Sequence, residues 1–165
     1  MLGGSPAAAG TMTSGGSESV LMAVKTARDH ARSERPAITK PQMLLPVTAH
    51  PAFLKAAHYF DVEPVLVPVD AGFKADLAEA KKLINDSTIL VVGSAPAYPH
   101  GVIDPVEGLA GLAKERGVWM HVDGCLGGFL LPWVKKLGHP IPPFDLSVDG
   151  VCSISADIHK YGFAA

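Results

Sequence analysis

The sequence predicts an α/β domain with a mostly parallel sheet and helices on both faces. Helix-like and strand-like segments alternate along the chain with short links between them, which is typical of βαβ units. The segment 88–93 is apolar and β-branched, as expected of a strand that is buried on both faces of a parallel sheet. No repeat or linker divides the 165 residues, a length that suits one domain with a buried core. We therefore expect a single domain over 1–165.

The helices are recognised by their apolar spacing and by signals at their ends. In 20–35 the basic residues Arg32 and Arg35 come late and Pro36 follows, as at the carboxyl end of a helix. Pro105 suits the first position of another helix. We expect helices over 20–35, 49–60, 73–84, 105–116 and 127–137, the last one short and broken near Pro132.

The strands are short apolar segments. Pro64 has no N–H to donate to a central ladder, so we expect the second strand to lie at or near an edge of the sheet. Strands are expected over 43–47, 64–69, 88–93, 118–122, 146–148 and 151–155.

Polar residues directly follow several of these strands. His50 follows the first strand, Ser94 the third, Asp123 the fourth, and His159 and Lys160 the last. In open α/β sheets, ligands bind at the carboxyl ends of the strands. The sequence therefore predicts one site at this edge of the sheet.

The composition narrows the class of protein. Charged residues make up 18% and hydrophobic residues 48% of the chain, and the mean hydropathy is +0.25, which suits a part of a larger, multi-chain body. The net charge of -2 gives no sign of the excess of basic residues with which proteins bind nucleic acid or an anionic membrane surface. No apolar run reaches the roughly 18 residues of a transmembrane helix. Cys125 and Cys152 are expected to be reduced thiols, so we expect a cytoplasmic protein.

The segment 13–19, Thr-Ser-Gly-Gly-Ser-Glu-Ser, opens the first helix. Free N–H groups at a helix N-terminus bind anions, and Gly15 and Gly16 would allow close approach while Ser17 adds a hydroxyl donor. An ordinary N-cap by Ser14 or Ser17 explains the same residues. The segment is neither a Walker A loop nor a dinucleotide fingerprint.

Three further candidates each have two explanations. Lys160 is either a surface lysine past the sheet edge or a desolvated amine that can form a Schiff base with an aldehyde. Asp123 is either a helix cap or the partner of a protonated ring nitrogen. His50 is either a capping residue or an imidazole that lies face-on against an aromatic cofactor.

Together, these candidates favour one ligand. An anion cradle, a stacking imidazole, a buried carboxylate and a lysine match pyridoxal phosphate, which has a phosphate, a flat ring with a basic nitrogen, and an aldehyde. Gly124, Gly127 and Gly128 would let the flat ring come close. A zinc site is disfavoured because only His121 and Asp123 have ligand spacing. A serine hydrolase is disfavoured because no Gly-x-Ser-x-Gly elbow is present.

Longer motifs surround these residues: Pro-His-Gly-Val-Ile-Asp-Pro at 99–105, Cys-Leu-Gly-Gly-Phe at 125–129 and Ser-Ala-Asp-Ile-His-Lys-Tyr-Gly at 155–162. With the Gly-Gly-Ser, Ala-His and Asp elements in the same order, they resemble the sphingosine-1-phosphate lyase family. That family belongs to the fold type I, decarboxylase-like (aspartate aminotransferase-like) enzymes that use pyridoxal phosphate. The resemblance covers nearly the whole chain, and the three longer motifs resemble the lyases more than the amino-acid decarboxylases.

The resemblance implies roles for the candidate residues. Lys160 would form the Schiff base with the cofactor, Asp123 would keep the ring nitrogen protonated, and His50 would stack on the ring. These three would be the catalytic residues. The other cofactor-binding residues would be Gly15, Gly16, Ser17 and His159.

The resemblance also implies an activity. A phosphorylated long-chain amino alcohol such as sphingosine 1-phosphate would be cleaved by a retro-aldol reaction to a fatty aldehyde and phosphoethanolamine, in a homodimer. The chain would be the cofactor-binding large domain, without the N-terminal segment and C-terminal small domain of the family. Two alternatives stay open: a decarboxylase for glutamate, aspartate or aromatic amino acids, and a cofactor-binding fragment that does not catalyse a reaction.

Overall fold

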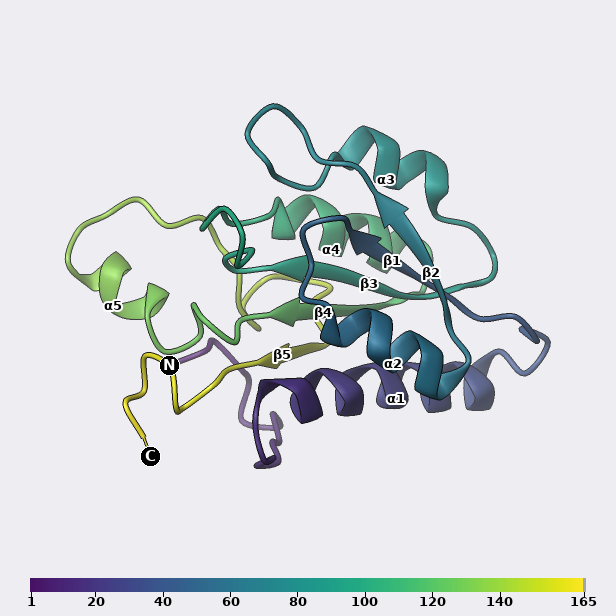
Figure 1. Ribbon diagram of the computed structural model, residues 1–165, viewed down its shortest axis with the longest axis horizontal. Coiled ribbons are helices and arrows are strands. Elements are labelled where there is room, and N and C mark those ends of the chain that lie inside the picture. Colours follow the sequence, from purple (N-terminus) through teal and green to yellow (C-terminus); the bar gives the residue numbers. More distant parts are fainter. Residues whose placement is uncertain (165) are drawn as a thin grey trace.

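The sheet is parallel, as expected, and its strands lie in the order β2-β1-β3-β4-β5 (Figure 1). The computed structural model describes residues 1–164; Ala165, the last residue of the expected domain, lies outside the described residues. The strands are β1 (Gln42–Pro46), β2 (Glu63–Val67), β3 (Thr88–Ser94), β4 (Trp119–Asp123) and β5 (Ser153–Ser155). The helices are α1 (Gly16–Glu34), α2 (Ala52–Phe60), α3 (Leu77–Leu83), α4 (Val106–Glu115) and α5 (Leu131–Lys136).

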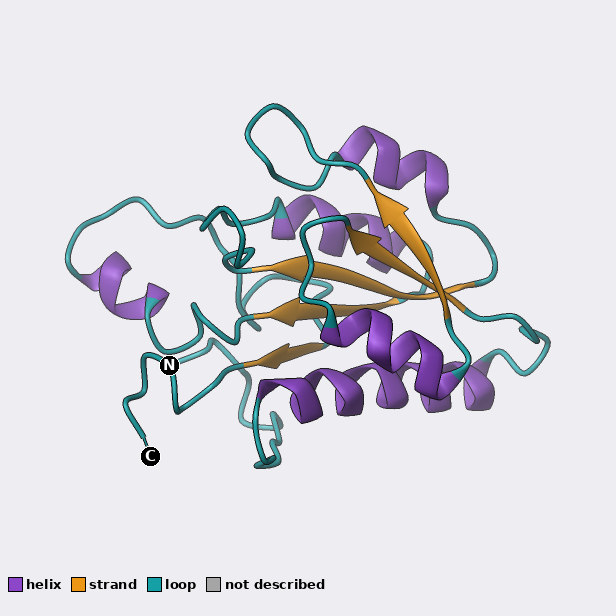
Figure 2. Cartoon of the chain, viewed as in Figure 1, coloured by secondary structure: helices purple, strands orange, loops and turns teal. Residues whose placement is uncertain are grey.

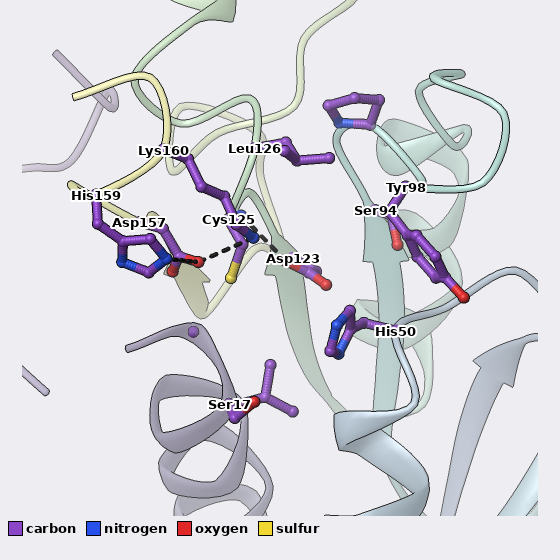
Figure 3. Close-up of a pocket in the computed structure, with 13 residues that line it drawn as sticks. Ser17, His50, Ser94, Tyr98, Asp123, Cys125, Leu126, Asp157, His159 and Lys160 are labelled. Carbon is purple, nitrogen blue, oxygen red and sulfur yellow. Dashed lines mark hydrogen bonds and ion pairs between the residues drawn. The ribbon is translucent and has the colours of Figure 1, made fainter. Parts of the chain in front are cut away.

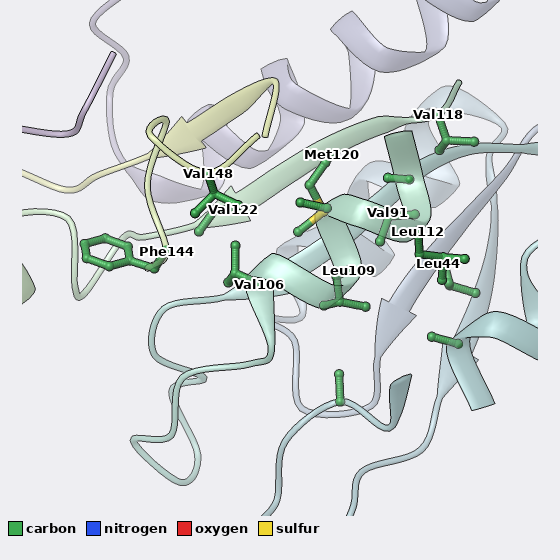
Figure 4. Packing of buried hydrophobic residues seen from close by; sticks show 14 of the residues in the cluster. Leu44, Val91, Val106, Leu109, Leu112, Val118, Met120, Val122, Phe144 and Val148 are labelled. Atoms are coloured by element: carbon green, nitrogen blue, oxygen red, sulfur yellow. The ribbon is translucent and has the colours of Figure 1, made fainter. Parts of the chain in front are cut away.

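Helices cover both faces of the sheet, which confirms the predicted fold class (Figure 2). Neighbouring strand residues point to opposite faces. Met43 therefore packs in the core beneath α1 and α2, and Leu44 packs in the core beneath α3 and α4. Figure 4 shows the second core, in which Leu109 of α4 lies over Met120 of β4. Burial of these apolar surfaces on both sides is the main force that holds the layers together.

The central and edge strands behave as their sequences predict. All seven residues of β3 are buried, as expected of its continuous apolar run. β2 lies at the edge of the sheet, where Pro64 leaves no ladder donor unpaired. None of the described helices is long and apolar enough to cross a membrane.

The expected helix over 73–84 begins later, at Leu77. Phe73 has a φ of 61°, in the left-handed region, so the chain turns there and does not continue as a helix. Asp76 caps the helix, because its side chain accepts hydrogen bonds from the amides of Ala78 and Glu79.

The expected strand over 146–148 is wrong. The Leu146 amide donates to the carbonyl of Leu2 in the N-terminal lead, and the Val148 amide donates to the Asp145 carbonyl, which closes a turn. The Asp145 side chain also accepts from the Ser147 amide. These hydrogen bonds take the place of a ladder, so β5 is the only strand after β4 within residues 1–164.

The three glycines after β4 were expected to make room for a flat ring, and this expectation is wrong. A Cβ at Gly127 would lie 2.1 Å from the Ala95 carbonyl oxygen, and one at Gly128 would lie 2.5 Å from the Ala156 Cβ. A Cβ at Gly124 would lie 2.8 Å from the backbone oxygen of Ser155. These glycines let the turn after β4 pack against its neighbouring chain segments.

We predict that Gly127→Ala destabilises the protein, because the added methyl group would overlap a backbone oxygen that cannot rotate away. Overpacking of this kind costs about 1–3 kcal/mol or more. The matched control is Gly111→Ala in α4, where a Cβ would meet nothing within 4 Å. This change should stabilise the helix by about 0.5–1 kcal/mol. Urea unfolding of the intact protein measures both, and equal effects of the two substitutions would contradict the packing argument.

His121 is a histidine buried within the sheet. Its Nδ1 lies 2.8 Å from the Ser153 hydroxyl oxygen, which also accepts a hydrogen bond from the indole N–H of Trp119. Its Nε2 is buried without a hydrogen-bond partner within residues 1–164. Burial lowers the pKa of His121 from 6.5 to about 4, and the negative charge of Asp123 opposes this shift in part. The imidazole is therefore neutral at pH 7.

The lowered pKa of His121 predicts a loss of stability in acid. Between pH 4 and 6.5 the unfolded chain binds a proton on this imidazole that the folded chain does not bind. The free energy of unfolding should therefore rise with pH across this window, by about 3 kcal/mol relative to His121→Gln. Urea unfolding of both proteins at pH 4, 5, 6 and 7 measures the difference. A pH-independent difference would show that His121 titrates normally.

Candidate cofactor site

A cavity of about 230 Å³ lies at the carboxyl ends of the strands, where the sequence places its candidate residues (Figure 3). Segments that follow β1, β3, β4 and β5 line it together with the start of α1. Sheet order reverses between β1 and β3, so this is also the topological switch point at which open sheets bind ligands. Six of the seven expected site residues line the cavity: Gly16, Ser17, His50, Asp123, His159 and Lys160. Gly15 lines the adjoining cavity, 3.8 Å from the His159 ring as measured from an added Cβ.

The start of α1 offers free amides to the cavity. Gly15 stands at the N-cap position with a φ of 152°, a conformation that favours glycine, and no side chain caps the helix. The Ser14 amide instead donates to the Glu18 carboxylate, and hydrogen bonding from the side chain and the amide of Ser14 holds the pKa of Glu18 below its usual value. The N-cap by Ser14 or Ser17 that would also explain this segment is therefore absent at the start of α1. The first-turn N–H groups and the positive end of the helix dipole favour an anion here.

Asp123 ends β4 and is 8% exposed. One carboxylate oxygen accepts a hydrogen bond from the Cys125 amide at 3.1 Å, and the carboxylate lines the cavity. The strand register places Asp123 beside Ser94 of β3 and Ser155 of β5. Asp123 therefore lies on the floor of the cavity, where its charge faces the ligand space.

His50 follows β1 and lies across the cavity from Lys160 (Figure 3). Its Nδ1 accepts a hydrogen bond from the Ala52 amide at 3.1 Å, which fixes the ring at the start of α2. The ring of Tyr98 meets it edge-on, with 5.5 Å between the ring centroids. His50 thus caps the start of α2 and also presents its ring to the cavity.

The loop after β3 is held by a buried carboxylate. Asp104, 2% exposed, accepts hydrogen bonds from the amides of Ser94 and Ala75, both at 2.8 Å. Burial raises the pKa of this carboxyl, and the two backbone donors oppose the rise. A bridge between Ala97 and Val102 closes the loop. These bonds set the positions of Ser94 and Tyr98 at the cavity wall.

Lys160 reaches the cavity through an ion pair. Its Nζ lies 2.9 Å from a carboxylate oxygen of Asp157, and the His159 Nε2 lies 3.7 Å from the same oxygen. The side chain of Lys160 is 33% exposed, whereas that of Asp157 is 3% exposed. Lys160 is therefore drawn into the cavity and does not extend freely into solvent.

Cys125 contributes a neutral thiol to the wall. It donates a hydrogen bond to the Ser155 hydroxyl, and burial together with the charge of Asp123 raises the pKa of the thiol far above its usual value. A protonated, buried thiol is a poor nucleophile. Within residues 1–164, no group of three His, Cys, Asp or Glu side chains is arranged to hold a metal ion.

Two residues of the cavity were missed by sequence reasoning. Asp157 lies in the motif that carries Lys160, and its carboxylate was not recognised because its contact with Gly16 joins the two ends of the chain. Tyr98 lies in the proline-rich loop after β3, which was described only as a loop. The strand-end rule that found Ser94 could have found both, if it had been applied to whole loops.

Comparison with known proteins bears out the resemblance. The pyridoxal-dependent decarboxylase conserved domain matches residues 2–165. A sphingosine-1-phosphate lyase of Oryza sativa is 56% identical over 155 residues, which are 94% of this chain and 29% of the relative. A probable L-tyrosine/L-aspartate decarboxylase of Methanothermobacter thermautotrophicus is 37% identical, over 96% of this chain and 42% of its own.

The solved structures agree. A sphingosine-1-phosphate lyase of Burkholderia pseudomallei superposes with a TM-score of 0.88 at 47% identity, over 91% of this chain and 34% of the other. The chain thus spans about 30% of the length of the lyases that it matches. The domain match, the fold and the shared identity together show that this chain belongs to the pyridoxal-dependent decarboxylase family and is similar, within it, to the sphingosine-1-phosphate lyases.

Proposed function

We propose that this chain is the pyridoxal-phosphate-binding part of a lyase that cleaves a phosphorylated long-chain amino alcohol. The observation that carries the proposal is the cavity, which joins Lys160, Asp123, His50 and the uncapped start of α1 at one edge of the sheet. The higher identity to sphingosine-1-phosphate lyases, 56% against 37% for the amino-acid decarboxylase, supports a lyase of this type.

The residues present fit pyridoxal phosphate. The start of α1 has no side-chain cap, so the amides at Gly16 and Ser17 are placed to bind a phosphate. The buried carboxylate of Asp123 is placed to hold a proton on a ring nitrogen, and the His50 ring to pack against the face of the ring. Lys160 Nζ, inside the cavity, is placed to join the aldehyde. His159, beside Gly15, is placed to contact the phosphate.

Bound pyridoxal phosphate supplies an aldehyde that condenses with amines and a protonated ring that accepts the electron pair of a breaking bond. With the cofactor bound, the buried carboxylate of Asp123 would keep the ring nitrogen protonated. In the substrate, the C3 hydroxyl loses its proton, the C2–C3 bond breaks and C2 gains a proton. Lys160 Nζ and the His50 imidazole both line the cavity and would be suited to move these protons. The products are a long-chain aldehyde and phosphoethanolamine.

We also propose a homodimer in the cytoplasm. Large apolar side chains on the surface, among them Leu54, Tyr59 and Leu66, support contact with a second copy. Cys125 and Cys152 are free thiols, as is usual in the reducing cytoplasm. We assign residues 1–165 to the cofactor-binding domain.

We predict that the intact protein binds pyridoxal phosphate covalently at Lys160. The purified protein should be yellow, and borohydride reduction should fix the cofactor to the peptide that carries Lys160, as mass spectrometry can measure. Lys160→Ala should lose the absorbance band because no other lysine within residues 1–164 lines the cavity. The matched control Lys81→Ala, an exposed lysine of α3, should keep it. A colourless wild-type protein would contradict the proposal.

We predict that the intact protein converts sphingosine 1-phosphate to a long-chain aldehyde and phosphoethanolamine. Mass spectrometry quantifies both products. Turnover should fall by about 10²-fold or more in Lys160→Ala, which removes the amine that would join the cofactor and move protons. A similar fall is expected in Asp123→Asn, which removes the carboxylate that would keep the ring nitrogen protonated. Carbon dioxide from glutamate, aspartate or an aromatic amino acid, without aldehyde, would favour a decarboxylase. Bound cofactor without turnover of either substrate class would indicate a binding module without catalytic activity.

A further inference from the structure

Asp157 is a buried carboxylate to which the proposed function assigns no role. Its side chain is 3% exposed, yet it lies against two basic side chains: the Lys160 Nζ at 2.9 Å and the His159 Nε2 at 3.7 Å (Figure 3). A buried carboxylate that loses its cation keeps a large desolvation penalty, so such a pair is strongly coupled. The positive charge on the Lys160 nitrogen and the negative charge on Asp157 therefore stabilise each other.

The backbone and α1 hold Asp157 in place. Its amide donates to the Cys125 carbonyl at 3.3 Å, and its own carbonyl accepts from the Lys160 amide at 3.4 Å. On the other side, a Cβ at Gly16 would lie 2.5 Å from one carboxylate oxygen of Asp157. The carboxylate is thus packed against the first turn of α1, between chain segments that the backbone hydrogen bonds hold in place.

The other charged groups of the cavity do not replace Asp157. Asp123 accepts from the Cys125 amide, and no ion pair joins it to Lys160 within residues 1–164. Burial raises the pKa of the Cys125 thiol, so this group is neutral. The titratable groups that face the lysine from all elements around it are His50, Tyr98, Asp123, Cys125, Asp157 and His159.

We infer that Asp157 is the counter-ion of the Lys160 nitrogen and a positioning residue of this site. The inference rests on the proposed function, because it concerns the lysine that would join the cofactor. In the cofactor-free protein, Asp157 holds the amine inside the cavity. When that nitrogen is joined to the aldehyde carbon of the cofactor, the Asp157 carboxylate would stabilise the positive charge on the nitrogen. A positively charged nitrogen withdraws electrons from the carbon, which makes this carbon easier for the substrate amine to attack.

The first test needs no cofactor. Acetic anhydride labels lysines in the intact, cofactor-free protein, and mass spectrometry compares the rate at Lys160 with the rate at exposed Lys81. In Asp157→Asn the amine loses the ion pair that shields it, so Lys160 should react several-fold faster. The matched control is Asp149→Asn, which removes the acid from the exposed Lys114–Asp149 pair and should leave Lys160 unchanged.

The second test uses the bound cofactor. The absorbance of pyridoxal phosphate bound to Lys160 changes when the joining nitrogen loses its proton, so a pH titration reports the charge directly. In Asp157→Asn the transition should move to lower pH by about one unit or more, because an opposite charge within ion-pair distance has this effect. A residue that serves only the fold would not move this transition.

Asp157→Ser provides a second variant, because it is smaller and cannot crowd Gly16. Both variants should show the same two changes with unaltered circular dichroism. Equal labelling of Lys160 in wild type and in both variants, or an unmoved absorbance transition, would overturn the inference. Failure of the wild-type protein to bind pyridoxal phosphate would overturn the proposed function, and the labelling rates would still decide whether Asp157 is the counter-ion of Lys160.

Discussion

The register of three parallel strands is the constraint on which the site depends. β3, β4 and β5 pair so that Ser94, Asp123 and Ser155 lie side by side in one row. The chain segments that follow this row therefore leave the sheet together, and they carry Tyr98, Cys125 and Lys160 to the same cavity. A slip of one residue in β4 would turn the Asp123 side chain to the other face of the sheet. The buried apolar residues on both faces oppose such a slip, so packing in the core fixes the position of the carboxylate.

The site also joins the two ends of the chain, which only the completed fold can do. α1, near the N-terminus, packs on the same face of the sheet as α2, and its first turn touches the loop after β5 at Asp157. Gly16 is the point of contact, because any larger residue would push into the carboxylate. The same turn presents its uncapped amides to the cavity. One packing contact therefore positions both the uncapped start of α1 and the loop that holds Lys160.

Sequence patterns predict the parts of this structure that local chemistry controls. Alternating apolar segments predict the fold class, Pro64 predicts an edge strand, and the strand-end rule predicts that His50, Asp123 and Lys160 share a site. The misses have a common physical cause, which is a partner distant in the sequence. The turn at Leu146 depends on a bond to Leu2. The glycines after β4 lie against the Ala95 carbonyl and the chain at Ser155 and Ala156, and they do not line the cavity. Asp157 was overlooked for the same reason.

Two buried carboxylates, Asp123 and Asp157, line this cavity, and they have different partners. Asp157 takes the Lys160 ammonium at 2.9 Å, whereas Asp123 takes a single backbone donor from Cys125. If Lys160 were paired with Asp123, the charge of that carboxylate would be neutralised before any ring nitrogen arrived. Because Asp157 pairs with the lysine and the neutral thiol of Cys125 brings no competing charge, the carboxylate of Asp123 would be available to a protonated ring nitrogen in the proposed function. The ion pair between Lys160 and Asp157 therefore affects the charge available at Asp123 as well as the position of Lys160.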